Sequence, residues 1–164
     1  YLYFGELNEY KKPDLAVKAF NKLGYPLVVI GDGSLTRYLK KISNHNITFL
    51  GRIKDNEVNK YLSQAKALIY PGIEDFGIIP VESMASGTPV IAYKRGGIID
   101  TLDDNISGIF FDEQTVDSLI KCVKNFEKNI KKYDSAKIKK SVIKFSSRSF
   151  QKKLKEFVAI VKKN

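Results

Sequence analysis

The sequence predicts an α/β fold, a doubly wound parallel sheet of about six strands with helices on both faces. Short apolar runs of strand length alternate with longer segments whose apolar residues recur at helical spacing. Glycine and proline mark most of the boundaries between the two kinds of segment. A chain of 164 residues with 43% hydrophobic residues has the size and composition of one globular domain. We therefore treat residues 1–164 as a single unit.

The strands are predicted from continuous apolar runs, the pattern of strands that are buried on both faces of a parallel sheet. In chain order they cover residues 1–4, 26–30, 47–50, 67–70, 90–92 and 108–111. Glycines follow the first three strands, at Gly5, at Gly31 and Gly33, and at Gly51. A Gly-x-Gly after a strand also occurs in dinucleotide-binding folds. Because Thr36 stands where the third glycine belongs, NAD binding is disfavoured.

The helices are predicted from amphipathic spacing and from residues that start or stop helices. Pro13 opens the first helix, Gly24 ends it, and Asp55 is the expected N-cap of the third. A short helix has Pro80 near its start and ends before Gly87. Apart from this short helix, the predicted helical segments cover residues 13–23, 35–42, 55–64, 98–102, 115–126, 135–144 and 149–162.

Residues 70–91 are the most informative stretch of the chain, with the sequence YPGIEDFGIIPVESMASGTPVI. They run strand, loop, helix, strand, so the loop lies at the carboxyl edge of a parallel sheet, where open α/β sheets bind ligands. The first N–H groups of the helix, from Gly77, Ile78 and Ile79, have no partner within the helix and carry partial positive charge. The stretch therefore predicts a binding site for an anion such as phosphate.

Two acidic residues flank this predicted anion site. Glu74 precedes the helix and Glu82 lies in its first turn. Carboxylates are poor partners for phosphate but good ones for hydroxyl groups, such as those of a ribose. A ligand with phosphates at its centre and hydroxyls at both ends is a nucleotide sugar. The alternative is that Glu82 only complements the helix dipole and that Glu74 is solvated.

The same stretch resembles the signature of glycosyltransferase family 4. Glu74 and Glu82 are separated by seven residues, Phe-Gly follows closely after the first Glu, and ESMASGTPVI completes the pattern. The resemblance implies the GT-B fold, sugar transfer with retention of anomeric configuration, and no need for a metal or other cofactor. It also implies that the chain is the donor-binding C-terminal half of an enzyme. A separate N-terminal acceptor domain is then expected outside residues 1–164, and the start at Tyr1, inside an apparent strand, suits that expectation.

The loop after the first strand should lie at the same sheet edge, so Lys11 and Lys12 can reach a diphosphate there. The alternative is that both lysines are solvated. The resemblance assigns diphosphate binding to Lys11 and contact with the sugar to Glu74, and we expect these two residues to be catalytic. The other residues expected to bind the donor are Lys12, Gly31, Gly33, Gly51, Arg52, Ile53, Asp75, Phe76, Gly77, Ile78, Ile79 and Glu82.

One position departs from the family pattern. Family members usually have Arg directly after the glycine of the first loop, where this chain has Glu6. A carboxylate cannot replace a guanidinium at a phosphate. Either Lys12 compensates, or Glu6 turns away from the site, or donor binding is weakened.

The net charge of +10 is concentrated in the last third of the chain. Residues 1–111 hold 13 Lys/Arg and 12 Asp/Glu, whereas residues 112–164 hold 15 and 6. This basic tail is either a solvated helix face or a surface that anionic lipid attracts. A nucleic-acid site is disfavoured, because no aromatic residues interleave with the lysines as a stacking platform requires. The single cysteine, Cys122, excludes an internal disulfide and fits a reducing compartment.

These observations predict the donor-binding half of a retaining glycosyltransferase that takes a UDP- or GDP-linked sugar and makes a surface polysaccharide or glycolipid. The expected location is the cytoplasm, with the inner face of the membrane as one option. The expected partners are the nucleotide sugar, the N-terminal domain and, through the lysine-rich C-terminal helices, anionic lipid. Two alternatives remain: a catalytically weakened module that only binds nucleotide sugars, and a related nucleotide-sugar epimerase or phosphorylase.

Overall fold

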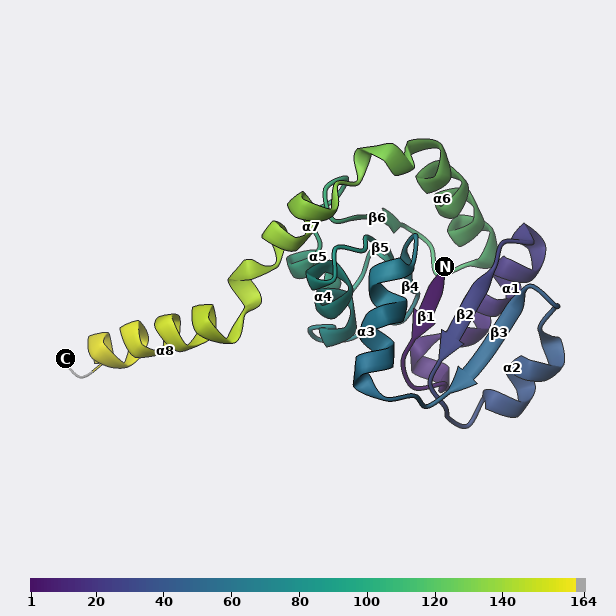
Figure 1. Ribbon diagram of the computed structural model, residues 1–164, viewed down its shortest axis with the longest axis horizontal. Helices are drawn as coiled ribbons and strands as arrows, with labels where there is room; N and C mark the ends of the chain where they lie inside the picture. Colours follow the sequence, from purple (N-terminus) through teal and green to yellow (C-terminus); the bar gives the residue numbers. More distant parts are fainter. Residues whose placement is uncertain (162–164) are drawn as a thin grey trace.

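The computed structural model describes residues 1–161 (Figure 1), so the predicted end of the last helix at residue 162 lies outside the described part. Six strands form one sheet in the order β3-β2-β1-β4-β5-β6, and all five neighbouring pairs are parallel. This confirms the predicted doubly wound parallel sheet. The strands are β1 (Leu2–Phe4), β2 (Leu27–Ile30), β3 (Ile47–Gly51), β4 (Leu68–Tyr70), β5 (Val90–Tyr93) and β6 (Gly108–Phe111).

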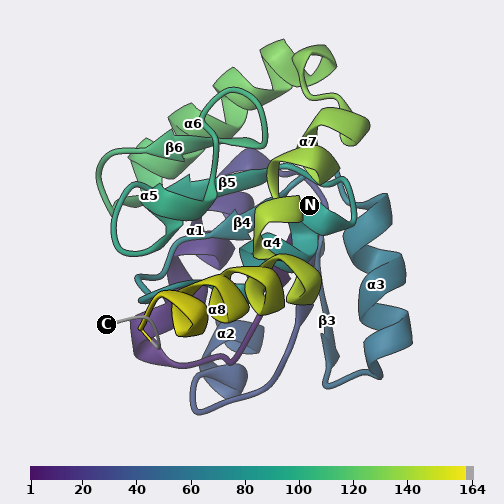
Figure 2. The same ribbon diagram turned by 90° about the vertical axis from the view of Figure 1, so that its left-hand side faces the viewer.

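Helices cover both faces of the sheet (Figures 1 and 2). One face packs against α1 (Pro13–Leu23), α2 (Thr36–Ile42) and α6 (Val116–Asn129). The opposite face packs against α3 (Asp55–Gln64), α4 (Ile78–Ala85), α5 (Ile98–Thr101) and α7 (Ser135–Ser141). The remaining elements are the short 3-10 turns η1 (Glu9–Lys11), η2 (Ile130–Lys132) and η3 (Ile143–Phe145) and the C-terminal helix α8 (Ser147–Val161).

The core is double because side chains alternate across each strand. In β4, Ile69 belongs to the apolar cluster on the α1 face, whereas Leu68 and Tyr70 belong to the cluster on the α4 face. All three side chains are buried. This explains why the strands read as continuous apolar runs in the sequence.

Several helix boundaries differ from the predicted ones. Asp55 is the first residue of α3 and not its N-cap, because the Glu57 side chain reaches back to accept from the Lys54 N–H at 3.3 Å. The segment predicted as one helix over 135–144 is broken into α7 and η3. There the Ser141 hydroxyl donates to the Ile138 carbonyl at 2.7 Å and competes with continued helix bonding.

Helix α6 continues three residues further than predicted, and Glu127 in that added turn explains the extension. Its Oε1 accepts from the Tyr1 hydroxyl at 2.7 Å and from Lys66 Nζ at 2.8 Å. Helix α8 begins two residues earlier than predicted, where the Ser146 hydroxyl accepts from the Ser149 N–H at 3.3 Å.

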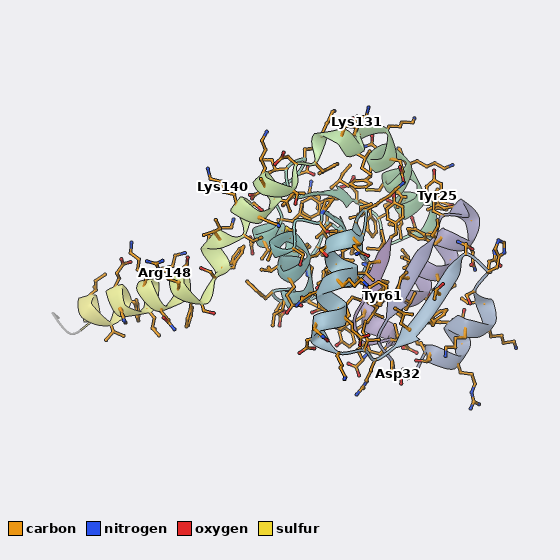
Figure 3. All side chains as sticks on the ribbon, in the orientation of Figure 1. Tyr25, Asp32, Tyr61, Lys131, Lys140 and Arg148 are labelled. Atoms are coloured by element: carbon orange, nitrogen blue, oxygen red, sulfur yellow. The ribbon has the colours of Figure 1, made fainter. Side chains whose placement is uncertain are left out.

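Helix α8 runs away from the body of the molecule (Figure 1). Its apolar residues Phe150, Leu154 and Phe157 are all exposed. They recur at helical spacing and form one stripe. The basic residues lie around it and before it, and Figure 3 shows Lys131, Lys140 and Arg148 projecting outward from the C-terminal segments.

Candidate functional site

The strand order reverses its direction between β1 and β4. The chain leaves β1 towards α1 on one face and leaves β4 towards α4 on the other face. The two loops therefore diverge at the carboxyl edge, which is where open α/β sheets leave a crevice for a ligand. The predicted residues Lys11 and Glu74 come from these two loops.

The start of α4 offers three backbone donors to this crevice. Gly77 is the N-cap, with a φ of 79°, and no side chain caps the helix. Within residues 1–161, no acceptor pairs with the N–H groups of Gly77, Ile78 or Ile79. Pro80 follows in the first turn and has no N–H to leave unpaired. Unpaired N–H groups at a helix start are the arrangement that favours an anion, and anion binding here stays a prediction.

Lys11 points at this helix start from the β1 side. A Cβ atom added to Gly5 would lie 3.6 Å from the Lys11 side chain and 3.6 Å from Ile79, so both cover the same glycine. The neighbouring Lys12 adopts φ 53°, one of two positive-φ residues other than glycine in the described chain. Its turn ends η1 and opens α1, which fixes the direction in which Lys11 leaves the backbone.

Lys11 and Glu74 form an ion pair across the crevice, with Nζ 2.9 Å from Oε1. Their side chains are 15% and 23% exposed, which makes this the most enclosed ion pair among the described residues. The two atoms are close, but the angles between them do not suit a hydrogen bond. The buried Glu74 Oε1 therefore receives no hydrogen bond within residues 1–161. A carboxylate oxygen in this position still needs a donor.

A pocket of about 610 Å³ opens over this pair. It is lined by Tyr10, Lys11, Ile73, Glu74, Asp75, Phe76, Gly77, Ile78 and Ile79. Seven of these nine residues are ones that the sequence predicted to bind the donor; the other two are Tyr10 and Ile73. The Lys11 ammonium also lies 5.6 Å from the centre of the Tyr10 ring. The pocket thus combines a cation, two carboxylates, an aromatic face and free backbone donors.

Two buried tyrosines lie close to Glu74. The Tyr70 hydroxyl is within hydrogen-bonding reach of the Glu74 carboxylate but makes no well-aligned hydrogen bond among the described residues. Burial raises the pKa of the Tyr70 hydroxyl, and the charge and proximity of Glu74 raise it further. Burial and then Glu74 likewise raise the pKa of Tyr3, whose hydroxyl donates to the Lys11 carbonyl at 3.4 Å. Both hydroxyls therefore stay protonated and remain donors.

Glycines hold the Glu74 loop from both sides. A Cβ atom at Gly72 would lie 2.9 Å from the Lys11 Cα, so the loop packs directly on the backbone of η1. On the other side, the Gly97 N–H donates to the Glu74 carbonyl at 2.8 Å, and a Cβ at Gly96 would lie 2.6 Å from that oxygen. No larger side chain fits at either place, so the backbone around Glu74 is tightly confined.

Glu82 lies apart from this pocket. It does not line the cavity that Glu74 lines. Burial and, next, the Asp55 charge raise the pKa of Glu82. Asp55, whose charge acts on Glu82, is the first residue of α3, and the loop before α3 holds Arg52 and Ile53 after Gly51, the last residue of β3.

The glycines after β1, β2 and β3 hold three loops together. The Gly31 N–H donates to the Gly51 carbonyl at 2.8 Å, and a Cβ at Gly31 would overlap the Gly5 carbonyl. A Cβ at Gly33 would lie 2.6 Å from the Leu7 carbonyl. These contacts account for Gly31 and Gly33 by loop packing, without a ligand. The loop residue Glu6 is exposed and does not line the pocket.

The sequence reasoning missed Tyr70, Gly72 and Phe145. Tyr70 read only as the end of an apolar strand, and Gly72 as part of a loop. Phe145 contacts Phe76 from the segment before α8, with ring centroids 5.5 Å apart. Only Gly72 left a sequence signal, since a glycine beside a predicted ligand loop can mark a close backbone approach.

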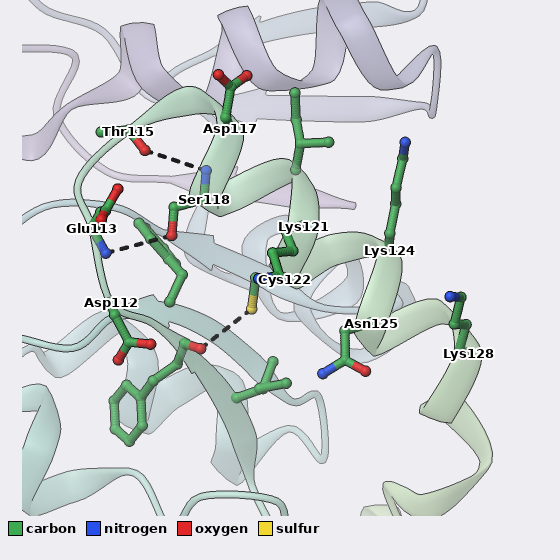
Figure 4. Close-up of a pocket in the computed structure, with 14 residues that line it drawn as sticks. Asp112, Glu113, Thr115, Asp117, Ser118, Lys121, Cys122, Lys124, Asn125 and Lys128 are labelled. Atoms are coloured by element: carbon green, nitrogen blue, oxygen red, sulfur yellow. Dashed lines mark hydrogen bonds between the residues drawn. The ribbon is translucent and has the colours of Figure 1, made fainter.

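A larger cavity, of about 1130 Å³, lies elsewhere, between β6 and α6 (Figure 4). Figure 4 shows Lys121, Lys124 and Lys128 along α6 and the Cys122 thiol donating to the Phe110 carbonyl at 3.5 Å. Burial raises the pKa of Cys122 to about 12, so the thiol is unreactive at neutral pH. The cavity holds none of the predicted site residues, and we place the candidate site at the smaller pocket.

Among residues 1–161, no three His, Cys, Asp or Glu side chains are grouped closely enough to hold a metal ion. No helix in that range combines the length and the apolar composition needed to cross a membrane.

Comparison with known proteins supports the sequence resemblance. The family described as Glycosyl transferases group 1 matches residues 1–144. An uncharacterized glycosyltransferase of Methanocaldococcus jannaschii is 28% identical over 128 residues, covering 72% of this chain and 33% of its own. The GDP-mannose-dependent α-(1-6)-phosphatidylinositol monomannoside mannosyltransferase of Mycobacterium tuberculosis is 28% identical over 113 residues, covering 61% of this chain and 29% of its own.

Solved structures share the fold. The Anabaena protein HepE in complex with UDP superposes with a TM-score of 0.82 at 17% identity, covering 96% of this chain and 48% of that one. Sucrose-phosphate synthase of Thermosynechococcus elongatus gives 0.84 at 20% identity, covering 98% and 45%. The chain thus spans about a third of these curated relatives and just under half of these solved structures.

Proposed function

The chain belongs to the family of group 1 glycosyl transferases, and on that premise we propose that it binds the nucleotide sugar in an enzyme that transfers the sugar to an acceptor hydroxyl. The observation that carries the proposal is the crevice where Lys11, Glu74 and the free N–H groups of α4 meet. We propose further that transfer retains the anomeric configuration. As the acceptor we propose, separately, a surface polysaccharide or a glycolipid.

Leaving-group stabilisation is the proposed mechanism. When the bond between sugar and phosphate breaks, negative charge grows on the diphosphate and the sugar becomes oxocarbenium-like. Lys11, Lys12 and the N–H groups at the start of α4 neutralise that charge in fixed positions. Glu74 holds hydroxyls of the sugar, and Glu82 holds the ribose. No step in this scheme needs a metal or a cofactor.

The donor is proposed to be a UDP- or GDP-linked sugar. HepE has been crystallised with UDP and with UDP-glucose, and the mycobacterial relative depends on GDP-mannose. The segment of Gly51, Arg52 and Ile53 is the proposed base contact, because it lies at the end of β3, at the same carboxyl edge of the sheet.

Calorimetry tests this proposal. UDP, GDP, UDP-glucose and GDP-mannose are titrated into the wild-type chain and into Lys11→Gln. We expect the ligands of one nucleobase, uracil or guanine, to bind at micromolar to millimolar concentration. Lys11→Gln should weaken their binding about tenfold or more, since it removes the positive charge that pairs with the diphosphate. Lys22→Gln, which removes an exposed charge on α1 outside the pocket, is the matched control and should bind as wild type. No binding of any of the four ligands at millimolar concentration would reject the proposal.

The main alternative is a nucleotide-sugar binding module with a weakened site. The reason to consider it is Glu6, which stands where the resemblance expects Arg. Glu6→Arg in the full-length protein, assayed for sugar transfer, separates the two functions. A gain of about tenfold or more supports a weakened module, whereas unchanged transfer supports an intact site with Glu6 outside it. Product analysis in the same assay separates a transferase from an epimerase or a phosphorylase.

We also propose two contacts for α8. Its exposed apolar stripe of Phe150, Leu154 and Phe157 is the proposed contact with the other half of the enzyme, and the surrounding lysines are the proposed contact with the anionic inner face of a membrane. Co-sedimentation with vesicles of phosphatidylglycerol and of phosphatidylcholine tests the second contact. Binding to the anionic vesicles that 0.5 M salt abolishes is expected, and equal binding to both lipids would contradict it.

A further inference from the structure

We infer that Glu74 is the internal counter-ion of Lys11 and makes the pocket prefer a nucleotide sugar to the bare nucleoside diphosphate. The inference rests on the proposed function and adds a basis for selectivity to it. It starts from the 2.9 Å ion pair between the two residues, in which Glu74 engages the Lys11 charge that a phosphate needs.

The pair is enclosed enough for its charges to matter. Both side chains are less than a quarter exposed, and the aromatic ring of Tyr10 and the buried Tyr70 lie beside them. In such surroundings, taking one partner away leaves the other as an uncompensated charge, which is strongly unfavourable. Surface ion pairs such as Lys22–Asp117, with side chains 62% and 88% exposed, have no comparable effect.

A bare diphosphate therefore meets a competitor. To bind, its phosphates must draw Lys11 away from Glu74, and Glu74 then loses its counter-ion next to an incoming anion. Nothing on a bare nucleoside diphosphate restores the lost contact, because its terminal phosphate brings only acceptors and further negative charge. The binding of this ligand is weakened accordingly.

A nucleotide sugar meets no such penalty. Its phosphates take Lys11, and its sugar hydroxyls donate to the Glu74 carboxylate that Lys11 has left. Lys11 Nζ is 2.9 Å from the buried Glu74 Oε1, but no well-aligned hydrogen bond reaches that oxygen among the described residues, so a sugar hydroxyl can donate one. The exchange replaces one partner of each charge by a better-aligned one. The same device favours release of the nucleoside diphosphate after its sugar has been transferred.

The test compares a bare and a sugar-linked nucleotide. Calorimetry measures Kd for UDP and UDP-glucose, or for GDP and GDP-mannose, whichever pair the chain binds. We expect Glu74→Gln to tighten binding of the bare diphosphate about tenfold and to reduce or abolish the advantage of the sugar-linked form. Glu74→Asp keeps the charge but withdraws it by one methylene, and it should give an intermediate ratio of the two constants.

An acidic residue outside the pocket provides a matched control. Glu9→Gln makes the same change of charge two residues from Lys11, but Glu9 is exposed, does not line the pocket and forms no ion pair within residues 1–161. It should leave the ratio of the two constants unchanged. In the double variant Lys11→Gln with Glu74→Gln, the second substitution should no longer tighten the diphosphate, because there is no ammonium left to release.

The outcomes separate this inference from the proposed function. If wild type binds the nucleotides but Glu74→Gln leaves the Kd of the bare diphosphate unchanged, or Glu9→Gln alters the ratio equally, the counter-ion role is wrong and the nucleotide site stands. Tightening by Glu74→Gln that persists without Lys11 also rejects the role, since it reflects overall charge. If no nucleotide binds to wild type, both the inference and the proposed function fall.

Discussion

The ring of Phe76 meets the ring of Phe145 edge to face, with centroids 5.5 Å apart and an interplanar angle of 82°. Phe76 lines the candidate pocket, and Phe145 ends η3, two residues before α8 begins. The contact links the loop that carries Glu74 to the segment from which α8 departs. The position of that segment and the shape of the pocket are therefore physically connected.

Phe145→Ala should weaken nucleotide-sugar binding about three- to tenfold, because the Phe76 side of the pocket loses its support. The free energy of unfolding should fall by about 1–2 kcal/mol, less than for a fully buried phenylalanine. Calorimetry and urea unfolding measure the two effects. Ile143→Ala, in the same short turn but 61% exposed, is the control and should leave binding unchanged. Equal affinities for Phe145→Ala and wild type would show that the ring pair does not support the pocket.

Gly72→Ala should disrupt the Lys11–Glu74 pair. Its Cβ would lie 2.9 Å from the Lys11 Cα, and backbone has to move to relieve that overlap. We expect a loss of about 1–3 kcal/mol in unfolding free energy and at least tenfold weaker binding of a nucleotide sugar. Gly24→Ala separates packing from backbone strain. Gly24 has φ 70° with no atom within 4 Å of an added Cβ, so its substitution should reduce stability by about 1 kcal/mol without affecting binding. A Gly72→Ala chain that binds as wild type would refute the close approach.

Nucleotide binding should weaken on acidification, and the midpoint of that loss should lie above the pKa of an ordinary glutamate. Burial and the Asp55 charge raise the pKa of Glu82, so Glu82 takes up its proton earlier as the pH falls. A protonated Glu82 accepts ribose hydroxyls less well than the carboxylate does. Asp55→Asn removes the like charge, lowers the pKa of Glu82 and should move the midpoint of the loss to lower pH. The measurement is Kd as a function of pH.

The control for this pH profile is Glu57→Gln, on the same helix as Asp55. Glu57 is not among the charges that raise the pKa of Glu82. Its substitution should leave the midpoint where it is in wild type. A midpoint that fails to move in Asp55→Asn would place the titration on another group and would remove Glu82 from the binding site.

Thr88→Val should destabilise the fold without altering the pocket directly. The buried Thr88 hydroxyl donates to the Leu62 carbonyl, and this bond connects the segment between α4 and β5 to α3. Valine fills the same space but leaves that carbonyl unpaired, so the free energy of unfolding should fall by about 1–2 kcal/mol. Thr48→Val on the exposed side of β3 should change it by less than about 0.5 kcal/mol. Urea unfolding that gives equal values for the two variants would contradict this role.

Short-range features of the chain were predictable from the sequence. Apolar runs bounded by Gly5, Gly31 and Gly51 indicated the strands, and the order strand–loop–helix placed Glu74 and Gly77 at the binding edge. The helix boundaries were less predictable. Ser141, Ser146 and Glu57 set them through side-chain hydrogen bonds that depend on local competition with the backbone.

The long-range relationships were not predictable in the same way. Lys11 and Glu74 were each expected to bind part of a ligand, but their pairing needs β1 and β4 to be neighbours in the sheet. Glu82 was expected to flank the same anion as Glu74, but it does not line the pocket that Glu74 lines. Gly31 and Gly33 were expected at the nucleotide, and their contacts show that loop packing already requires glycine there.

The sequence by itself determined the α/β class, the number of strands and the loops that carry the site, because hydrophobic period and turn residues act over a few positions. Only the tertiary structure decided which of those loops touch, and so placed Lys11 against Glu74, Gly72 against Lys11 and Phe145 against Phe76. The physical reason is that these contacts depend on strand order and on close backbone approach between segments far apart in the chain. Neither leaves a local pattern from which its partner can be read.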